Sequence, residues 1–140
     1  MAFSLSLAHL EKAVLEACAK EDDWPAQVAA GIYAGVDFAI AHPEVAETLV
    51  PDAVEAGTMC YERLIGRLAG FLKGTAPQGK RLPGSTDEAL VAGVVGLVGD
   101  HLRIGRLDRL LELRPDLVLL TLLPYLGFAE AQRWANREII

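Results

Sequence analysis

One charged residue, Asp37, stands in the otherwise uncharged stretch between Pro25 and Ala41, and Tyr33 lies four residues before it. Residues four apart lie on the same face of a helix, so the phenol and the carboxylate would be neighbours. Such a pair suits the wall of a mostly apolar ligand pocket, where the carboxylate would accept a hydrogen bond or meet a cationic group. The alternative, which is the commoner arrangement, is a carboxylate at the helix edge that pairs with an arginine.

Three further side chains are candidates for a ligand site. Met59 and Cys60 are adjacent in a long apolar pattern, where a flexible thioether suits an adaptable pocket wall. Filling the core is the commoner role for both residues. His101 follows Asp100 near the end of a predicted helix, where it would contact a ligand or, alternatively, interact favourably with the helix dipole.

No arrangement of residues in the sequence predicts catalysis or metal binding. The three histidines, His9, His42 and His101, have no neighbouring Ser/Asp or Cys/His arrangement, and the stretch GVVGLVG lacks the strand-turn-helix context of a phosphate loop. Cys18 and Cys60 lie far apart and form no CxxC motif, so neither a disulfide framework nor a zinc site is expected. We therefore expect no enzyme activity, no metal and no cofactor.

The composition predicts one globular domain over residues 1–140. The chain is 52% hydrophobic and 23% charged, with a mean hydropathy of +0.29, which gives ample material for a core. The formal net charge of −6 would repel a phosphate backbone, so nucleic acid is not an expected partner of these residues. The first residues show no basic leader or small-residue cleavage site, which favours the cytoplasm.

Helical spacing of the apolar residues predicts an all-α fold of six or seven helices. Asp23 and Ser85 are expected as N-caps, the latter in a capping box with Glu88. The β-branched stretch VAGVVGLVG also suits a strand, but no second strand candidate pairs with it. The expected helices cover residues 4–20, 25–41, 43–50, 53–73, 86–105, 107–113 and 115–138, with a Gly/Pro-rich loop over 74–85.

Glycines recur inside the helix expected over 86–105, where each destabilises a helix by about 1 kcal/mol relative to Ala. Gly93 and Gly96 form a narrow stripe of small side chains with Ala89 and Asp100, which allows a second helix to approach closely. That helix would belong to the same chain or to a second copy, and the pattern alone leaves both alternatives open.

The most apolar run, LVLLTLLPYLG, extends from Leu117 to Gly127. It is too short to cross a bilayer, which needs about 20 apolar residues. Its leucines point all round the helix axis, so they need neighbours on nearly every side, and a two-fold interface between subunits would supply them. Pro124 should bend the helix and free the carbonyl of Leu120, which Thr121 would help to satisfy.

This order of elements resembles the C-terminal half of TetR-family transcriptional regulators. The resemblance rests on WPAQVAAGIYAGVDFAIAHPEVAETLV, a long amphipathic helix, a Gly/Pro loop, DEALVAGVVGLVGDHLRIG and RPDLVLLTLLPYLG, and covers nearly the whole chain. It implies a pocket for a small apolar effector and a homodimer in which the last two long helices form a four-helix bundle with their partners. The residues expected at that interface are Gly93, Gly96, Leu120, Leu123, Pro124 and Gly127, and those expected at the effector are Tyr33, Asp37, Met59, Cys60 and His101.

One departure from the family is large, because its DNA-binding helix-turn-helix should precede these helices and only MAF does so here. We therefore expect an effector-sensing and dimerisation module that contacts DNA only through a domain absent from this chain, and that has no membrane partner. The chain would be a fragment of a longer regulator or a natural stand-alone domain. The alternative function is a helical carrier that binds an apolar molecule without regulating transcription.

Overall fold

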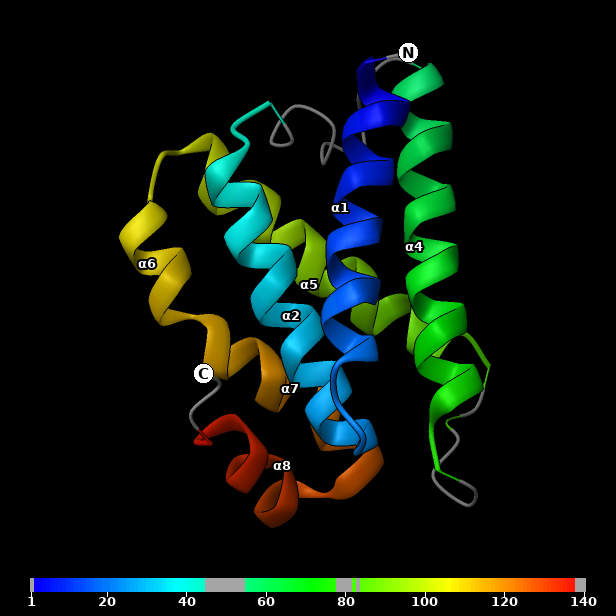
Figure 1. Ribbon diagram of the computed structural model, residues 1–140, viewed down its shortest axis with the longest axis vertical. Coiled ribbons are helices and arrows are strands. Elements are labelled where there is room, and N and C mark those ends of the chain that lie inside the picture. Colours follow the sequence, from blue (N-terminus) through cyan, green and yellow to red (C-terminus); the bar gives the residue numbers. More distant parts are fainter. Residues whose placement is uncertain (1, 45–54, 78–81, 83, 138–140) are drawn as a thin grey trace.

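The protein is all-α, as the apolar spacing predicts. The computed structural model describes residues 2–44, 55–77, 82 and 84–137, and in this part of the chain it has helices and no strand (Figure 1). The predicted short helix over 43–50 lies almost wholly outside the described residues. The helices are α1 (Ala2–Ala19), α2 (Trp24–Ala41), α4 (Glu55–Thr75), α5 (Thr86–Arg103), α6 (Leu107–Glu112), α7 (Arg114–Leu126) and α8 (Phe128–Ala135). Within the described ranges, none of them is long and apolar enough to cross a membrane.

Helices α1 and α2 form the closest pair, and two glycines of α2 allow their approach. A Cβ atom on Gly31 would lie 2.8 Å from the sulfur of Cys18, and one on Gly35 would lie 3.2 Å from a methyl group of Val14. The turn between the helices is fixed by the side-chain amide of Gln27, which donates a hydrogen bond of 3.0 Å to the carbonyl of Glu21. The sequence pattern did not single out Gly31 and Gly35 as a helix contact.

The glycine stripe of α5 has a different environment. A Cβ atom on Gly93 or Gly96 would meet no atom within 4 Å. Close packing inside this chain, one of the two alternatives for these glycines, is therefore absent from the described part of the structure. The stripe faces outward from the subunit.

Gly127 ends α7 instead of lying inside one long final helix, which corrects the prediction for residues 115–138. Its backbone has φ +84° and ψ 165°, a conformation that only glycine adopts readily, and α8 begins at the next residue. Pro124 does lie inside α7. The hydroxyl of Thr121 donates to the carbonyl of Leu117 at 2.9 Å, so it does not satisfy the Leu120 carbonyl as expected.

Two helix starts lie where predicted, although the capping contacts are absent. Asp23 and Ser85 occupy the N-cap positions of α2 and α5, and neither side chain makes a cap hydrogen bond. Ser85 has φ −102° and ψ 23°, outside the extended conformation that aims an N-cap side chain at the first turn. The predicted capping box with Glu88 is therefore not formed.

Helix α7 joins two groups of buried side chains. Leu117 packs with residues of α1, α2, α4, α5 and α6 at one end of the molecule. Val118, Leu122 and Tyr125 pack at the other end with Trp24 and with residues of α4 and α8. Helix α2 packs mainly on α1 and α7, whereas helix α4 packs mainly on α1 and α5. The space between α2 and α4 is where the pocket lies.

Candidate ligand-binding pocket

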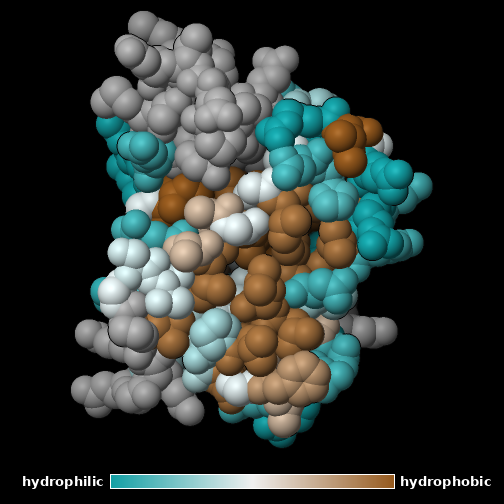
Figure 2. Space-filling model, turned by 180° about the vertical axis from the view of Figure 1, so that it is seen from behind, coloured by the Kyte–Doolittle hydropathy of each residue, from teal (hydrophilic) through white to brown (hydrophobic). Residues whose placement is uncertain are grey.

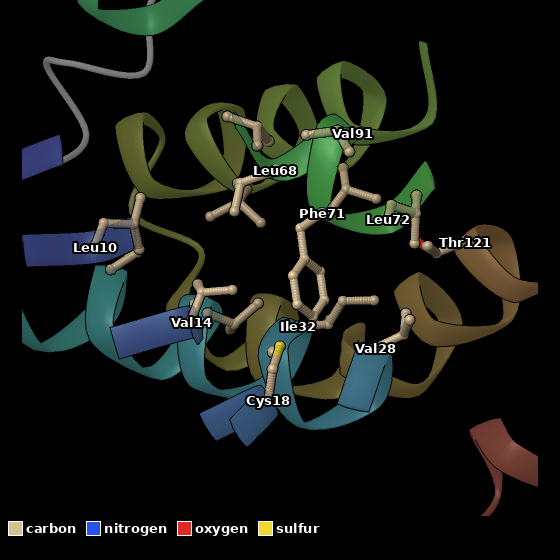
Figure 3. A pocket seen from close by; sticks show the side chains of 17 residues that line it. Leu10, Val14, Cys18, Val28, Ile32, Leu68, Phe71, Leu72, Val91 and Thr121 are labelled. Atoms are coloured by element: carbon tan, nitrogen blue, oxygen red, sulfur yellow. The ribbon is translucent and has the colours of Figure 1, made fainter. Parts of the chain in front are cut away.

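An apolar pocket lies among α1, α2, α4 and α5, and one residue of α7 reaches it (Figure 3). The cavity among its walls measures about 120 Å³. Binding pockets for small molecules usually measure about 300–1,000 Å³, so a ligand of that size would have to move the walls of this cavity apart. The lining residues are Leu10, Val14, Cys18, Val28, Gly31, Ile32, Gly35, Val36, Ala39, Leu68, Phe71, Leu72, Val91, Val94, Val95, Val98 and Thr121.

The two polar side chains in this lining have no free hydrogen to offer a ligand. The Cys18 thiol donates to the carbonyl of Gln27 at 3.2 Å, and the Thr121 hydroxyl donates to the carbonyl of Leu117. Burial raises the pKa of the Cys18 thiol from 9.0 to about 11, so it is protonated and unreactive at neutral pH. Among the described residues of the lining, none carries a charge. The pocket therefore suits the hydrocarbon part of a ligand.

Phe71 determines the shape of the pocket. Its ring extends from α4 across the cavity towards Ile32 and Cys18, between Val14 on one side and Val28 on the other (Figure 3). An aromatic ring of this size in the middle of an apolar cavity can change its rotamer without breaking a hydrogen bond. A ligand longer than either half of the cavity would have to move this ring.

One end of the pocket adjoins a cluster of polar and aromatic residues from four helices. Trp24, Thr75, Asp87 and Tyr125 each lie three or four positions from a lining residue of the same helix: Val28 in α2, Leu72 in α4, Val91 in α5 and Thr121 in α7. Residues at that spacing are neighbours on one helix face. Leu72 and Thr121 lie at one end of the cavity, and Val91 lies above Phe71 (Figure 3). We refer to Trp24, Thr75, Asp87 and Tyr125 as the polar cluster.

Hydrogen bonds hold the polar cluster together. The indole N–H of Trp24 donates to the hydroxyl of Thr75 at 3.0 Å, and that hydroxyl donates to the carbonyl of Phe71 at 2.6 Å. The hydroxyl of Tyr125 donates to Oδ1 of Asp87. Burial and the adjacent Asp87 carboxylate raise the pKa of Tyr125 well above its ordinary range, so the phenol stays neutral. The Trp24 and Tyr125 rings meet edge to face, with centroids 5.0 Å apart.

Asp87 is the one charged residue among the buried side chains of the described part of the chain. It is 2% exposed, and its Oδ2 accepts no hydrogen bond from the described residues. Asp87 lies in the first turn of α5, where the helix dipole stabilises a negative charge. A buried carboxylate oxygen with unused acceptor capacity therefore lies near the end of the pocket, outside its lining.

The structure places Tyr33 and Asp37 outside the lining of the pocket. Asp37 pairs with Arg114 at 2.9 Å, and the Arg114 guanidinium also lies over the Tyr33 ring, 4.7 Å from its centroid. This is the arginine-paired alternative, and it attaches α2 to the start of α7. A single sequence could not identify Arg114 as the partner, because it lies 77 positions away.

His101 does not line the pocket either. Its ring lies 2.8 Å from the carbonyl of Leu97, in the last turn of α5. This position agrees with the helix-dipole alternative. Met59 and Cys60 lie in α4, but their side chains are outside the described part of the structure. Among the described residues, no three His, Cys, Asp or Glu side chains form a metal site.

Most of the residues predicted for the dimer interface lie on the outward sides of α5 and α7. Gly93, Gly96 and Leu97 lie on the side of α5 opposite its pocket valines, and Leu120, Leu123 and Pro124 lie on the side of α7 opposite its buried residues. Leu97, Leu120 and Leu123 are 40%, 41% and 38% exposed, respectively. We refer to these six residues as the outer face, and apolar residues gather across the middle of this side of the molecule (Figure 2). Gly127 is also exposed, just beyond the end of α7.

Sequence analysis missed the residues that form the pocket. The valines Val91, Val94, Val95 and Val98 repeat at helical spacing, which marks a buried face but does not separate a cavity wall from a packed core. The sequence contained less indication that Asp87 is buried, since an acidic residue in a first helical turn is ordinarily exposed. Its burial depends on Tyr125, 38 positions away.

Comparisons with models of protein families, with curated proteins and with solved structures find no match to this chain. Its likeness to TetR-family regulators therefore stays a prediction from the sequence. The proposals that follow rest on the pocket, the polar cluster and the outer face.

Proposed function

We propose that this chain is the effector-sensing and homodimerisation module of a TetR-like transcriptional regulator, and that it binds a small, mostly apolar ligand. The observation that carries the proposal is the uncharged apolar pocket among α1, α2, α4 and α5. A cavity in a protein interior loses the packing contacts that a filled core would have, and a ligand restores them. DNA binding would belong to a helix-turn-helix domain outside these 140 residues.

Helix α5 supports the regulatory part of this proposal because it takes part in both features. Its valines line the pocket, and its opposite side carries the glycines and Leu97 of the outer face. A second subunit on the outer face would contact the same helix that contacts the ligand. Ligand binding would then change the position of α5 and the spacing of two DNA-binding domains, for which a preference of about 1–3 kcal/mol between two arrangements is sufficient.

The outer face also distinguishes this proposal from the carrier alternative. A stand-alone carrier needs the pocket but has no use for an exposed apolar surface on α5 and α7. Large exposed apolar patches commonly mark sites of protein association. The regulator therefore accounts for both features, whereas the carrier accounts for one.

Binding of a neutral apolar dye, such as Nile red, tests the pocket. Val94→Phe places a larger side chain in the pocket wall, and we expect it to weaken dye binding at least about tenfold because the added ring fills the ligand's space. Leu15→Phe is the matched control, since it introduces the same residue at an exposed position of α1 that belongs neither to the pocket lining nor to the outer face. Fluorescence titration measures both affinities, and equal binding by the two variants would contradict the proposal.

A further inference from the structure

The donors of the polar cluster are all in use, so the cluster can offer a ligand only hydrogen-bond acceptors. The N–H of Trp24 and the hydroxyls of Thr75 and Tyr125 each already donate a hydrogen bond. Oδ2 of Asp87 accepts none from the described residues, although buried carboxylate oxygens ordinarily accept hydrogen bonds. A ligand group that binds here must therefore bring a donor.

The negative charge of Asp87 also favours a ligand group that brings hydrogen-bond donors. Among the described residues, no arginine, lysine or histidine forms an ion pair with Asp87. A buried carboxylate without a cationic partner is unfavourable, and a positive ligand group would relieve this cost. The same carboxylate would repel a carboxylic acid or a phosphate ester.

The position of the cluster relates this acceptor to the pocket. Asp87 lies one helical turn beyond Val91, and its three partners lie about one turn beyond lining residues of α2, α4 and α7. Asp87 is not itself part of the lining. A head group could therefore reach Oδ2 only if side chains at that end of the cavity moved aside.

We propose that the ligand of this pocket is an amphipathic amine, whose apolar body fills the cavity and whose ammonium group binds Oδ2 of Asp87. An ammonium group supplies three donors and a positive charge, which matches an acceptor in a cluster whose donors are all in use. This inference rests on the proposed function, because it specifies the class of ligand for the same pocket. It assigns to Asp87 the recognition role that the sequence pattern suggested for Asp37.

Three probes with the same ten-carbon chain test the inference: decylamine, decanol and decanoate, each below its aggregation concentration at pH 7. Titration calorimetry on the wild-type chain should show decylamine binding about tenfold or more tightly than decanol, because it adds a charge-assisted hydrogen bond. Decanoate should bind most weakly. If decanol binds but decylamine binds no more tightly, the amine inference fails while the pocket stands. If none of the three binds, the proposed function fails as well.

Two substitutions in the first turn of α5 test whether Asp87 causes the preference for decylamine over decanol. Asp87→Asn keeps the size of the side chain and removes its charge, and it should lower decylamine affinity to that of decanol while decanol affinity changes less than about twofold. Glu88→Gln removes the same charge from the exposed neighbouring position and should leave the preference for decylamine unchanged. An unchanged preference in Asp87→Asn would overturn the inference.

Tyr125→Phe keeps the inference testable if Asp87→Asn does not fold. This variant removes the hydroxyl donor and leaves both oxygens of Asp87 without a partner among the described residues. If Asp87 binds the head group, decylamine should bind at least as tightly as to the wild type. If Asp87 serves only to hold α5 against α7, Tyr125→Phe should weaken decylamine and decanol equally, and that result would overturn the inference.

Discussion

At the scale of single residues, identical glycines serve different purposes in this chain. Gly31 lies where α1 and α2 cross, against the Cys18 sulfur, whereas Gly93 lies in a helix of the same subunit with open space beside it. Both belong to a G-x-x-small pattern, so sequence spacing alone does not separate them. What separates them is the neighbouring helix, which is present at one position and absent at the other.

Replacement of Gly31 by Ala should destabilise the protein by about 1–3 kcal/mol, because the new methyl group overlaps the Cys18 sulfur and presses on Val14. Gly70→Ala is the control, since α4 is open beside Gly70 and the change should stabilise the helix by up to about 1 kcal/mol. Denaturant unfolding measures both free energies.

A double mutant tests the assigned clash. In the background of Cys18→Ala, which removes the obstructing sulfur, Gly31→Ala should lose less stability than in the wild type. Additive free-energy changes in this cycle would show that the two residues do not press on each other.

At the scale of secondary-structure elements, the end of α7 shows how one backbone conformation changes the fold. The apolar pattern predicted one helix through residue 138, with Pro124 as its bend, but the chain turns at Gly127 and α8 begins. Helix α8 then buries Ala131 and Ala135 against the group that contains Trp24 and Tyr125. The polar cluster therefore depends on the turn at Gly127 for part of its cover.

Replacement of Gly127 by Ala should lower the free energy of unfolding by about 1–3 kcal/mol, since φ +84° with ψ 165° strains any residue with a Cβ atom. Gly66→Ala, in α4 with open space beside it, provides the control and should not destabilise the chain. Thermal and denaturant unfolding measure the difference. Equal stability of the two variants would mean that the turn at Gly127 is not under conformational constraint.

At the scale of the whole molecule, α5 and α7 each have one side in the subunit and one side at the surface. The leucines of the apolar run are divided accordingly: Leu117 and Leu122 are buried, whereas Leu120 and Leu123 are exposed. A homodimer through the outer face would bury the second side of both helices. The expected need for neighbours all round the α7 axis would then be met by two subunits together.

Replacing both Leu120 and Leu123 by Glu should convert a dimer into a folded monomer, because four charges would face each other across a two-fold interface. Leu15→Glu is the control: this residue is 37% exposed but lies on α1, outside the outer face. Sedimentation at micromolar concentration reports the subunit number, and circular dichroism verifies folding. A dimer that survives both Glu substitutions, or a wild-type chain that is monomeric, would exclude this interface.

Much of the fold could be predicted from the sequence, because helix formation depends on local spacing. Apolar residues at intervals of three and four defined α1, α2, α5 and α7, and prolines and the Gly/Pro loop marked boundaries between helices. The candidate site could not be predicted in the same way. The pocket and the polar cluster depend on contacts between residues tens of positions apart, and one sequence contains no information about which distant residues meet.

The sequence by itself therefore determined that this is an all-α chain, which helix faces are apolar, and that α5 and α7 have more apolar surface than one neighbour can cover. Only the tertiary structure decided that Asp37 forms an ion pair with Arg114 and that α2 and α4 stand far enough apart to leave a cavity. It also decided that Asp87 is buried near the end of this cavity, outside its lining. The physical reason is that a side chain becomes buried only when another helix packs against it, and a helix alone does not determine its neighbours. A buried carboxylate in particular is recognisable only when its surroundings are known.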